Sequence, residues 1–374
     1  MPAAKHLKIA IASAAHRAHY VDWFKEALLS QGVTGEVIAL EYRASAPTLA
    51  YADAAVIMPA YNSPEYRGAV VEWARNASPD FFISLNDYEL QILADGLADD
   101  LRELGCTVAA LDSAAQSAVL DKHLMAATLH RCGIPTPTTW LGSETAQVIK
   151  ANPGGAFVVK HRFGSGSAGL VFASAQNLRT AVFESAELAK AGDGRASVDG
   201  LDAVIIQERL PGTEFGVDGI FSLRGTGELR GVLARRKDRM RSGDTDVATT
   251  VAADRFAGSL AALGRILKPV GAIDVDFKES ADGSPLIIDV NPRFGGGYPF
   301  CHLAGADVPA DIVRMLAGLD DDRSLLNCEP GITSARREGF ALLGAAVIGR
   351  PPLISATPAE ESSRRQAVGI RPSA

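Results

Sequence analysis

The sequence contains few of the residues that mark metal-binding or disulfide-stabilised proteins. Its four cysteines form neither a CxxC pair nor another metal-ligand spacing, and its seven histidines are scattered along the chain. So few cysteines in a chain of this size indicate a reducing compartment, and we therefore expect a cytoplasmic protein.

Long apolar runs and an excess of positive charge are also missing. No stretch reaches the roughly 18 consecutive apolar residues of a membrane span. The formal net charge is −7 and only 6% of the residues are aromatic, which argues against a nucleic-acid-binding surface. Lys5 and Lys8 with the apolar residues 9–15 resemble a signal peptide, but the run is short, so a first β-strand is the better interpretation. We expect neither a nucleic-acid partner nor a membrane.

Strand and helix signals alternate in the first part of the chain. The 374 residues, 47% hydrophobic and 22% charged, fit an α/β protein of two or three packed units. Periodicity predicts strands over 8–12, 37–40, 54–58 and 81–85, and helices over 21–29, 70–77 and 89–104. The alternation predicts a Rossmann-like parallel sheet over residues 1–114, with a ligand site near the carboxyl ends of its strands.

A different pattern begins near residue 115. The predicted helices cover 120–132, 175–191 and 252–267, and the predicted strands cover 156–160, 203–208, 214–221, 231–236, 272–278 and 285–290. We divide this part into three segments: 115–200, 201–330 and 331–374. The last segment holds a final strand and a tail that we expect to be mobile.

A loop of small residues follows the strand predicted over 156–160. Lys160 ends that strand, and the loop continues with Gly164, Ser165, Gly166 and Ser167. The backbone amides of such a loop can close on phosphate oxygens. The spacing is not that of a P-loop, because no Lys-Ser/Thr pair follows the last glycine. A flexible hairpin loop explains this segment equally well when it is taken alone.

A hinge-like segment lies between the strands predicted over 203–208 and 214–221. Glu208, Arg209 and Leu210 lead into a turn, and Glu214 opens the next strand. A hinge backbone can pair with adenine, and a carboxylate can accept hydrogen bonds from ribose hydroxyls. A plain β-turn with a solvated Glu214 is the alternative.

The most specific pattern is a set of oxygen-bearing side chains on two neighbouring strands. Asp274 and Asp276 share a strand face, as do Asp289 and Asn291, and Arg293 follows. If the two strands pair, these hard oxygen ligands converge, which suits Mg²⁺ that bridges phosphates. Carboxylates so placed on apolar strands are costly to bury without a cation.

Residues 235–241 form a basic run in an acidic protein. The run has four arginines and one lysine against one aspartate. Because guanidinium groups suit carboxylate and phosphate geometry, we expect Arg235 or Arg241 to face the phosphates or a carboxylate substrate. The alternative is a solvated hairpin whose five basic side chains all point to solvent.

Asn86 and Asp87 stand where a predicted strand ends and a helix begins. One of them caps that helix, or the strand end binds a substrate amine.

Together these elements, in this order, resemble the ATP-grasp superfamily. The likeness covers roughly residues 115–320, and residues 1–110 resemble its pre-ATP-grasp domain. Among subfamilies, the chain is similar to the single-unit relatives of the carbamoyl-phosphate-synthase large chain and to the pyrrolysine-pathway ligase. The motifs that carry most of the match are Asp121-Lys122, Gly133-Ile134-Pro135-Thr136-Pro137 and Asn291-Pro292-Arg293. The resemblance implies two α+β lobes that clasp ATP.

The resemblance also implies roles for single residues. Lys122 and Lys160 would contact the ATP phosphates, although a solvated helix residue is the alternative for Lys122. The nucleotide would further be held by the loop residues 164–167, the hinge Glu208–Leu210 and Glu214. Two Mg²⁺ ions, with Mn²⁺ as the alternative, would bind Asp276, Asp289 and Asn291. Arg293, Lys160, Arg235 and Arg241 would act on the reacting groups.

Two residues depart from the family pattern, His161 where proline is common and Asp289 where glutamate is usual. We expect an ADP-forming ligase that activates a carboxylate as an acyl phosphate and joins it to an amine. The alternatives are a carbamoyl-phosphate-type or kinase-like enzyme that releases a phosphorylated product, and a nucleotide-binding protein without turnover. The expected partners are a small carboxylate, an amine and, from the general frequency of symmetric dimers, a second copy of the chain.

Overall fold

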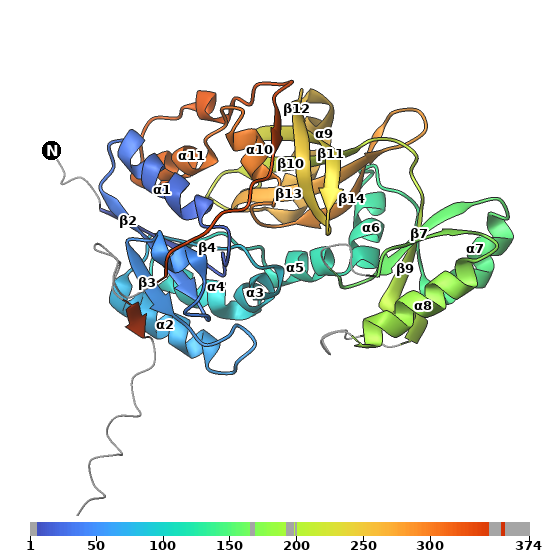
Figure 1. Cartoon of the computed structure of the whole chain (residues 1–374), viewed down its shortest axis with the longest axis horizontal. Helices are drawn as coiled ribbons and strands as arrows, with labels where there is room; N and C mark the ends of the chain where they lie inside the picture. Colours follow the sequence, from blue (N-terminus) through green and yellow to red (C-terminus); the bar gives the residue numbers. More distant parts are fainter. Residues whose placement is uncertain (1–5, 165–168, 192–197, 199, 344–352, 356–374) are drawn as a thin grey trace, which may run out of the picture.

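The computed structural model describes residues 6–164, 169–191, 198, 200–343 and 353–355. Its strands form two six-stranded sheets and one four-stranded sheet. Figure 1 shows the first domain and the large antiparallel sheet side by side, with the four-stranded lobe at the far end. Of the helices in the described part, none has both the length and the hydropathy needed to span a membrane.

The first domain has the predicted parallel sheet, in the order β16-β3-β2-β1-β4-β5. Its strands are β1 Leu7–Ala12, β2 Gly35–Glu41, β3 Ala54–Ile57, β4 Phe81–Ser84, β5 Thr107–Val108 and β16 Leu353–Ser355. Its main helices are α1 His19–Ser30, α2 Tyr66–Ala77, α3 Asp87–Ile92 and α4 Ala98–Glu103. The single helix predicted over 89–104 is wrong, because a π-helical turn at Leu93–Leu97 interrupts it where Gly96 has φ 116°. Glycine permits that backbone angle.

Helices α5 Ser113–Leu120 and α6 Lys122–Arg131 lead into the small lobe. This lobe is an antiparallel sheet in the order β6-β9-β7-β8. Its elements are β6 Thr139–Leu141, α7 Thr145–Ala151, β7 Ala156–His161, β8 Val171–Ser174, α8 Leu178–Ala191 and β9 Val204–Glu208. Because β9 pairs with β7, the change of sheet comes between Glu208 and Glu214, later than the predicted boundary at residue 200.

The large antiparallel sheet has the order β14-β13-β10-β11-β12-β15. Its strands are β10 Glu214–Phe221, β11 Leu229–Arg241, β12 Asp244–Val251, β13 Gly271–Glu279, β14 Pro285–Asn291 and β15 Thr333–Ala335. Three helices accompany it: α9 Asp254–Leu267, α10 Tyr298–His302 and α11 Val308–Ala317. Short 3₁₀ turns complete the list: η1 Pro47–Ala50, η3 Gly142–Glu144, η4 Gly200–Ala203 and η5 Arg323–Leu326.

The first domain and the large sheet share one hydrophobic core. That core joins residues of β1 and α1 to Phe294, Tyr298 and α11. Tyr20 is fully buried and its hydroxyl donates to the carbonyl of Gly295 at 2.9 Å. This packing holds the carboxyl ends of the parallel strands against the segment that follows β14.

The chain returns to the first domain at its end. Strand β15 pairs with β12, and β16 pairs in parallel with β3. Strand β15 lies in the segment where we predicted a final strand. The prediction of a mobile tail after about residue 351 is wrong for residues 353–355, which form β16, and residues 356–374 lie outside the described part.

Candidate active site

Strands β13 and β14 bring the predicted oxygen ligands face to face. Asp276 is opposite Asp289 and Asp274 is opposite Asn291 in the antiparallel register. The strand pairing on which the sequence argument depended is therefore confirmed. The 133–137 segment runs beside β14, where the Thr136 hydroxyl donates to the carbonyl of Ile287 at 2.9 Å.

Three lysines from different elements gather here, two on the carboxylates and one on the backbone of β14. Lys122 of α6 contacts Asp289 with an Nζ–Oδ1 distance of 2.6 Å. Lys237 of β11 bridges Asp276 and Glu214, with Nζ–O distances of 2.7 and 2.9 Å. Lys160 of β7 crosses from the small lobe and donates to the backbone carbonyl of Ile288 at 3.1 Å. The cluster thus connects both lobes.

Local structure fixes Lys122 at the start of its helix. The Asp121 carboxylate caps α6 by accepting from the amides of His123 and Leu124. The same carboxylate pairs with Arg162, just after β7, with N–O distances of 2.6 and 2.8 Å. Because Lys160 lies two residues before Arg162, this pair places both lysines beside the same strand.

The charges of the cluster perturb one another. Burial and the Lys122 charge lower the pKa of Lys160 to about 8, although Asp289 acts in the opposite direction. Burial raises the pKa of Asp276 to about 6 against the opposing effect of Lys237. Burial also acts to raise the pKa of Asp289, but Lys122 and Lys160 outweigh it and the net pKa is below its ordinary value.

These residues fit a magnesium ion that is shared with phosphates. Within the described part of the chain, no three His, Cys, Asp or Glu side chains lie close enough to hold a metal by themselves. Mg²⁺ commonly takes only one or two carboxylates plus substrate phosphates, and the opposed Asp276 and Asp289 provide two. The amide oxygen of Asn291 is a further hard donor. Asp276, Asp289 and Asn291 therefore remain our predicted ligands.

The basic run divides into a buried half and an exposed half. Arg235 is 1% exposed and pairs with Asp218 and Asp274, with N–O distances of 2.5 and 2.7 Å. Lys237 is largely buried as well, so the alternative in which all five basic side chains point to solvent is wrong. Arg241 lies near the hairpin tip, where it pairs with Glu338 at 2.9 Å.

The glycines after Arg293 allow the chain to close over Arg235. A Cβ atom on Gly297 would lie 2.0 Å from Nε of Arg235, and one on Gly295 would lie 2.3 Å from Cγ of Asp274. No side chain fits at either place. This run therefore serves the packing of a buried ion-pair cluster beside the site.

Arg293 makes the contact between β14 and the first domain. Its Nε and Nη2 donate to both carboxylate oxygens of Asp87, at 2.5 and 2.7 Å. Asn86 caps α3 by accepting from the amide of Tyr88 at 2.9 Å, which confirms the capping prediction and leaves Asp87 free to reach Arg293. The planar two-bond geometry holds the guanidinium in one orientation beside Asn291.

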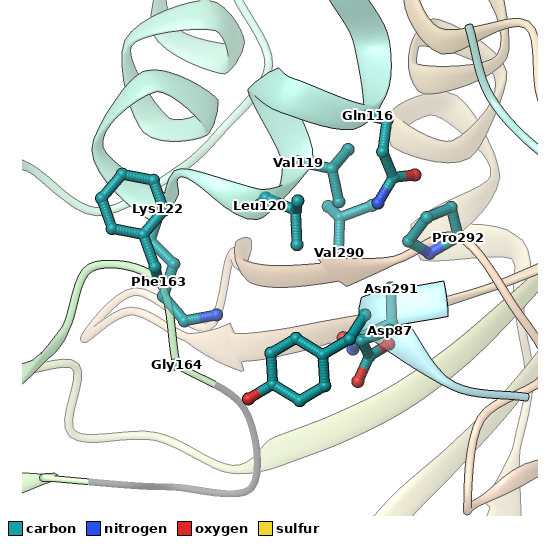
Figure 2. A pocket seen from close by; sticks show the side chains of 11 residues that line it. Asp87, Gln116, Val119, Leu120, Lys122, Phe163, Gly164, Val290, Asn291 and Pro292 are labelled. Atoms are coloured by element: carbon teal, nitrogen blue, oxygen red, sulfur yellow. The ribbon is translucent and has the colours of Figure 1, made fainter. Parts of the chain in front are cut away.

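A pocket lies between α3, α5, α6 and the end of β14 (Figure 2). Its lining combines charged, amide and apolar side chains: Asp87, Tyr88, Gln116, Val119, Leu120, Lys122, Phe163, Gly164, Val290, Asn291 and Pro292. In Figure 2 the ammonium of Lys122 and the carboxylate of Asp87 both border the same open volume. A second, smaller pocket between α6 and β14 is lined by Lys122, Thr136, Gln207, Asp289 and apolar side chains.

The described ends of the glycine loop rest on His161. A Cβ atom on Gly169 would lie 2.0 Å from Nε2 of His161, and one on Gly164 would lie 2.8 Å from its Cβ. The His161 ring also contacts the carbonyl of Ser185 at 3.2 Å. His161 thus lies against both Gly164 and Gly169, at the position where we noted a departure from the family's proline. The predicted residues Ser165, Gly166 and Ser167 lie outside the described part.

The hinge follows β9 as predicted. Leu210 is buried, Glu208 and Arg209 are exposed, and the Arg209 guanidinium lies 4.8 Å from the centre of the Phe172 ring. Glu214 opens β10, where Lys237 and Lys278 outweigh burial and keep its pKa below the ordinary value. Whether these residues hold adenine and ribose stays a prediction.

Sequence reasoning missed the parts that Lys237 and Gln116 play in the site. Lys237 was included only as a member of the basic run, although the period of two from Arg235 pointed to the same strand face. Gln116 gave no signal, because a glutamine on a predicted helix is ordinary.

Comparison with known proteins identifies the family. Residues 9–109 match the family model described as PylC-like, N-terminal domain. Residues 201–338 match the family model described as ATP-grasp in the biosynthetic pathway with Ter operon. The chain therefore contains a PylC-like N-terminal domain and an ATP-grasp domain. These matches confirm the family resemblance and the fold class predicted from the sequence. No curated protein matches the sequence significantly.

Solved structures show the same ATP-grasp fold at low identity. Biotin carboxylase from Campylobacter jejuni matches with a TM-score of 0.68 and 15% identity, over 88% of this chain and 75% of that one. The biotin carboxylase domain of Hydrogenobacter thermophilus 2-oxoglutarate carboxylase, in complex with MgADP, ADP and bicarbonate, matches with a TM-score of 0.66 and 15% identity, over 84% of this chain and 70% of that one. L-amino acid ligase from Bacillus licheniformis matches with a TM-score of 0.61 and 16% identity, over 87% of this chain and 78% of that one. At such identities the likeness shows the fold alone.

Proposed function

We propose that this ATP-grasp protein is a ligase that activates a carboxylate as an acyl phosphate and joins it to an amine, releasing ADP and phosphate. The observation that carries the proposal is the cluster around the opposed Asp276 and Asp289. Lys122 pairs with Asp289, and Lys160 donates to the neighbouring carbonyl of Ile288. Cations beside paired carboxylates suit the phosphates of a metal-bound nucleotide. The described groups include no residue placed as a covalent nucleophile, and this reaction needs none.

In the first step, a carboxylate oxygen of the substrate attacks the γ-phosphorus and the bond to the ADP oxygen breaks. The protein contributes position and charge, which is the main requirement of phosphoryl transfer. Lys122 and Lys160 neutralise phosphate oxygens, and Arg293, held by Asp87, faces the transferred group. Bound magnesium would polarise the γ-phosphate, with Asp276, Asp289 and Asn291 as its protein ligands.

In the second step, the lone pair of the neutral amine attacks the acyl carbon and phosphate leaves with the electrons of the C–O bond. The surplus amine proton passes to the departing phosphate or to solvent. The pocket of Figure 2 suits this step, because amide and carboxylate oxygens border it at one side while Lys122, at another side, is placed for phosphate. The glycine loop would exclude water, since an exposed acyl phosphate hydrolyses. That the relatives named above include an L-amino acid ligase and a MgADP complex supports the same chemistry.

The test is a matrix of small carboxylates and amines incubated with MgATP, with ADP, phosphate and products quantified together. We expect ADP and phosphate in equal amounts, and an amide, only when both substrates are present. ADP with a stable phosphorylated product would instead favour a carbamoyl-phosphate-type enzyme. Nucleotide binding without any ADP formation would contradict the ligase. The number of metal ions, a cytoplasmic location and a homodimer stay predictions.

A further inference from the structure

Gln116 is buried without hydrogen bonds. It is 1% exposed, and neither Nε2 nor Oε1 has a partner in the described structure. Gln207, which is similarly buried, donates to the Thr139 hydroxyl at 3.0 Å. A primary amide offers two donors and an acceptor, and buried groups of this kind are nearly always satisfied. The unpaired amide of Gln116 therefore needs an explanation.

The position of Gln116 points to a ligand. The side chain lines the pocket that also contains Asp87, Lys122 and Asn291. Figure 2 shows its amide extending from α5 toward Val290 and Pro292, on the side of the pocket where Asp87 lies. A molecule in this pocket can therefore reach the amide that the protein leaves unpaired.

The helix itself gives no reason for a glutamine here. Helix α5 is capped by Asp112, which accepts from the amide of Ala115, and its buried face consists of Ala115, Gln116 and Val119. An apolar side chain at the middle position would continue this face without leaving donors or an acceptor unpaired. A polar residue at such a position weakens the free protein unless another molecule satisfies it.

We propose that Gln116 determines specificity for the amine substrate. Its Oε1 accepts a hydrogen bond from the amino group, and its Nε2 donates to an oxygen of the same molecule. An α-amino acid carries an ammonium group and a carboxylate one carbon apart, so it satisfies both ends of the amide. Asp87 borders the same pocket but its carboxylate is already paired with Arg293, so Gln116 supplies an acceptor that no described protein donor occupies. This inference rests on the proposed ligase function and adds the residue that selects the nucleophile.

The test is calorimetric binding to the full chain with a non-hydrolysable ATP analogue and Mg²⁺. The ligands are α-amino acids, the matching amines without a carboxylate, and N-acetyl amino acids without an ammonium group. Gln116→Met removes the hydrogen bonds at similar volume, and Gln147→Met, on the exposed face of α7, is the matched control. We expect one or more amino acids to bind the wild type and the control, and to bind Gln116→Met at least about tenfold more weakly.

Two further readouts separate recognition from packing. The melting temperature of ligand-free Gln116→Met should not fall, because an unpaired polar group is replaced by an apolar one. A lowered melting temperature with unchanged amino acid affinity would make Gln116 a packing residue and overturn the proposal. If the methionine variant does not fold, Gln116→Glu serves instead, since it keeps the acceptor and loses the donor. It should shift preference from amino acids toward simple amines by about tenfold.

Binding and turnover can fail independently. If no member of the panel binds the wild type, the inference is overturned even where the nucleotide binds. If amino acids bind through Gln116 but no ADP forms with any carboxylate, the ligase function fails and the binding role stands.

Discussion

The protonation of Lys160 allows the predicted nucleotide site to be tested, because proton uptake on MgATP binding can be measured. The pKa of this lysine is lowered to about 8 by burial and by Lys122. Phosphate oxygens placed beside its ammonium group would stabilise the charged form and raise that pKa again. MgATP binding should therefore take up a proton wherever the free lysine is neutral, and Lys160→Met should abolish this uptake.

The expected magnitude follows from the lowered pKa. At pH 8 about half of the Lys160 side chains are neutral in the free protein, so binding should take up about 0.5 proton, falling to about 0.1 at pH 7. The fall from the ordinary 10.5 to about 8 corresponds to about 3 kcal/mol of unfavourable charging as an upper bound. The unfolded chain binds more protons between these values, so Lys160 makes folding stability rise with pH across that window.

The assay is titration calorimetry in buffers of different ionisation enthalpy, at pH 7 and pH 8. Lys150→Met, on the exposed surface of α7, is the control because it removes the same charge far from the cluster. Asp276, whose pKa burial raises to about 6, should add proton release near pH 6 as the metal binds. The difference between wild type and Lys160→Met isolates the lysine. Equal uptake in both proteins at pH 8 would refute the phosphate contact, as would an equal loss of affinity for ATP and for adenosine.

The remaining predictions concern the acidic, interdomain and basic residues. Asp276→Asn and Asp289→Asn should each lower kcat at least about 100-fold in a folded protein, and near wild-type kcat with Mg²⁺ in both would disprove the metal site. Asp87→Asn should lower kcat/KM by about tenfold, because Arg293 loses its bidentate partner; unchanged kinetics would refute that role. Arg235→Met should lower the free energy of unfolding, measured by chemical denaturation, by about 3–5 kcal/mol, because the Asp218 and Asp274 carboxylates are left unpaired. Arg241→Ala should lower the free energy of unfolding by less than about 1 kcal/mol but raise KM for the carboxylate substrate. An unchanged KM would show that Arg241 is a solvent-exposed residue without a role in substrate binding.

The first domain could be predicted from local sequence because its strands are short, apolar and regularly spaced. The strands predicted from 8–12 to 81–85 all occur in one parallel sheet. The helix predicted over 89–104 failed at Gly96, whose backbone angle depends on how the chain turns toward β5. Strand β16 could not be predicted, because only tertiary pairing with β3 makes those three residues a strand.

The acidic half of the site was predictable, because strand geometry has a period of two. Asp276 and Asp289 each sit in an apolar segment, and pairing of consecutive strands then brings them opposite one another. No such rule connects Lys122 with Asp289, or Asp87 with Arg293. Each of these pairs joins residues far apart in the chain, and their meeting depends on how whole lobes and domains pack.

The basic run shows where the period of two stops being informative. Arg235 and Lys237 point inward, as alternation requires, but the register shifts between Lys237 and Arg239. An uninterrupted alternation would also place Arg239 on the inner face, whereas it is exposed and pairs with Asp246 at 2.7 Å. A bulge adds one residue to a strand and reverses the facing of everything after it. The register shifts a second time between Arg239 and Met240. These two irregularities turn Arg239 away from the face that carries Arg235 and Lys237, and the charge pattern does not encode them.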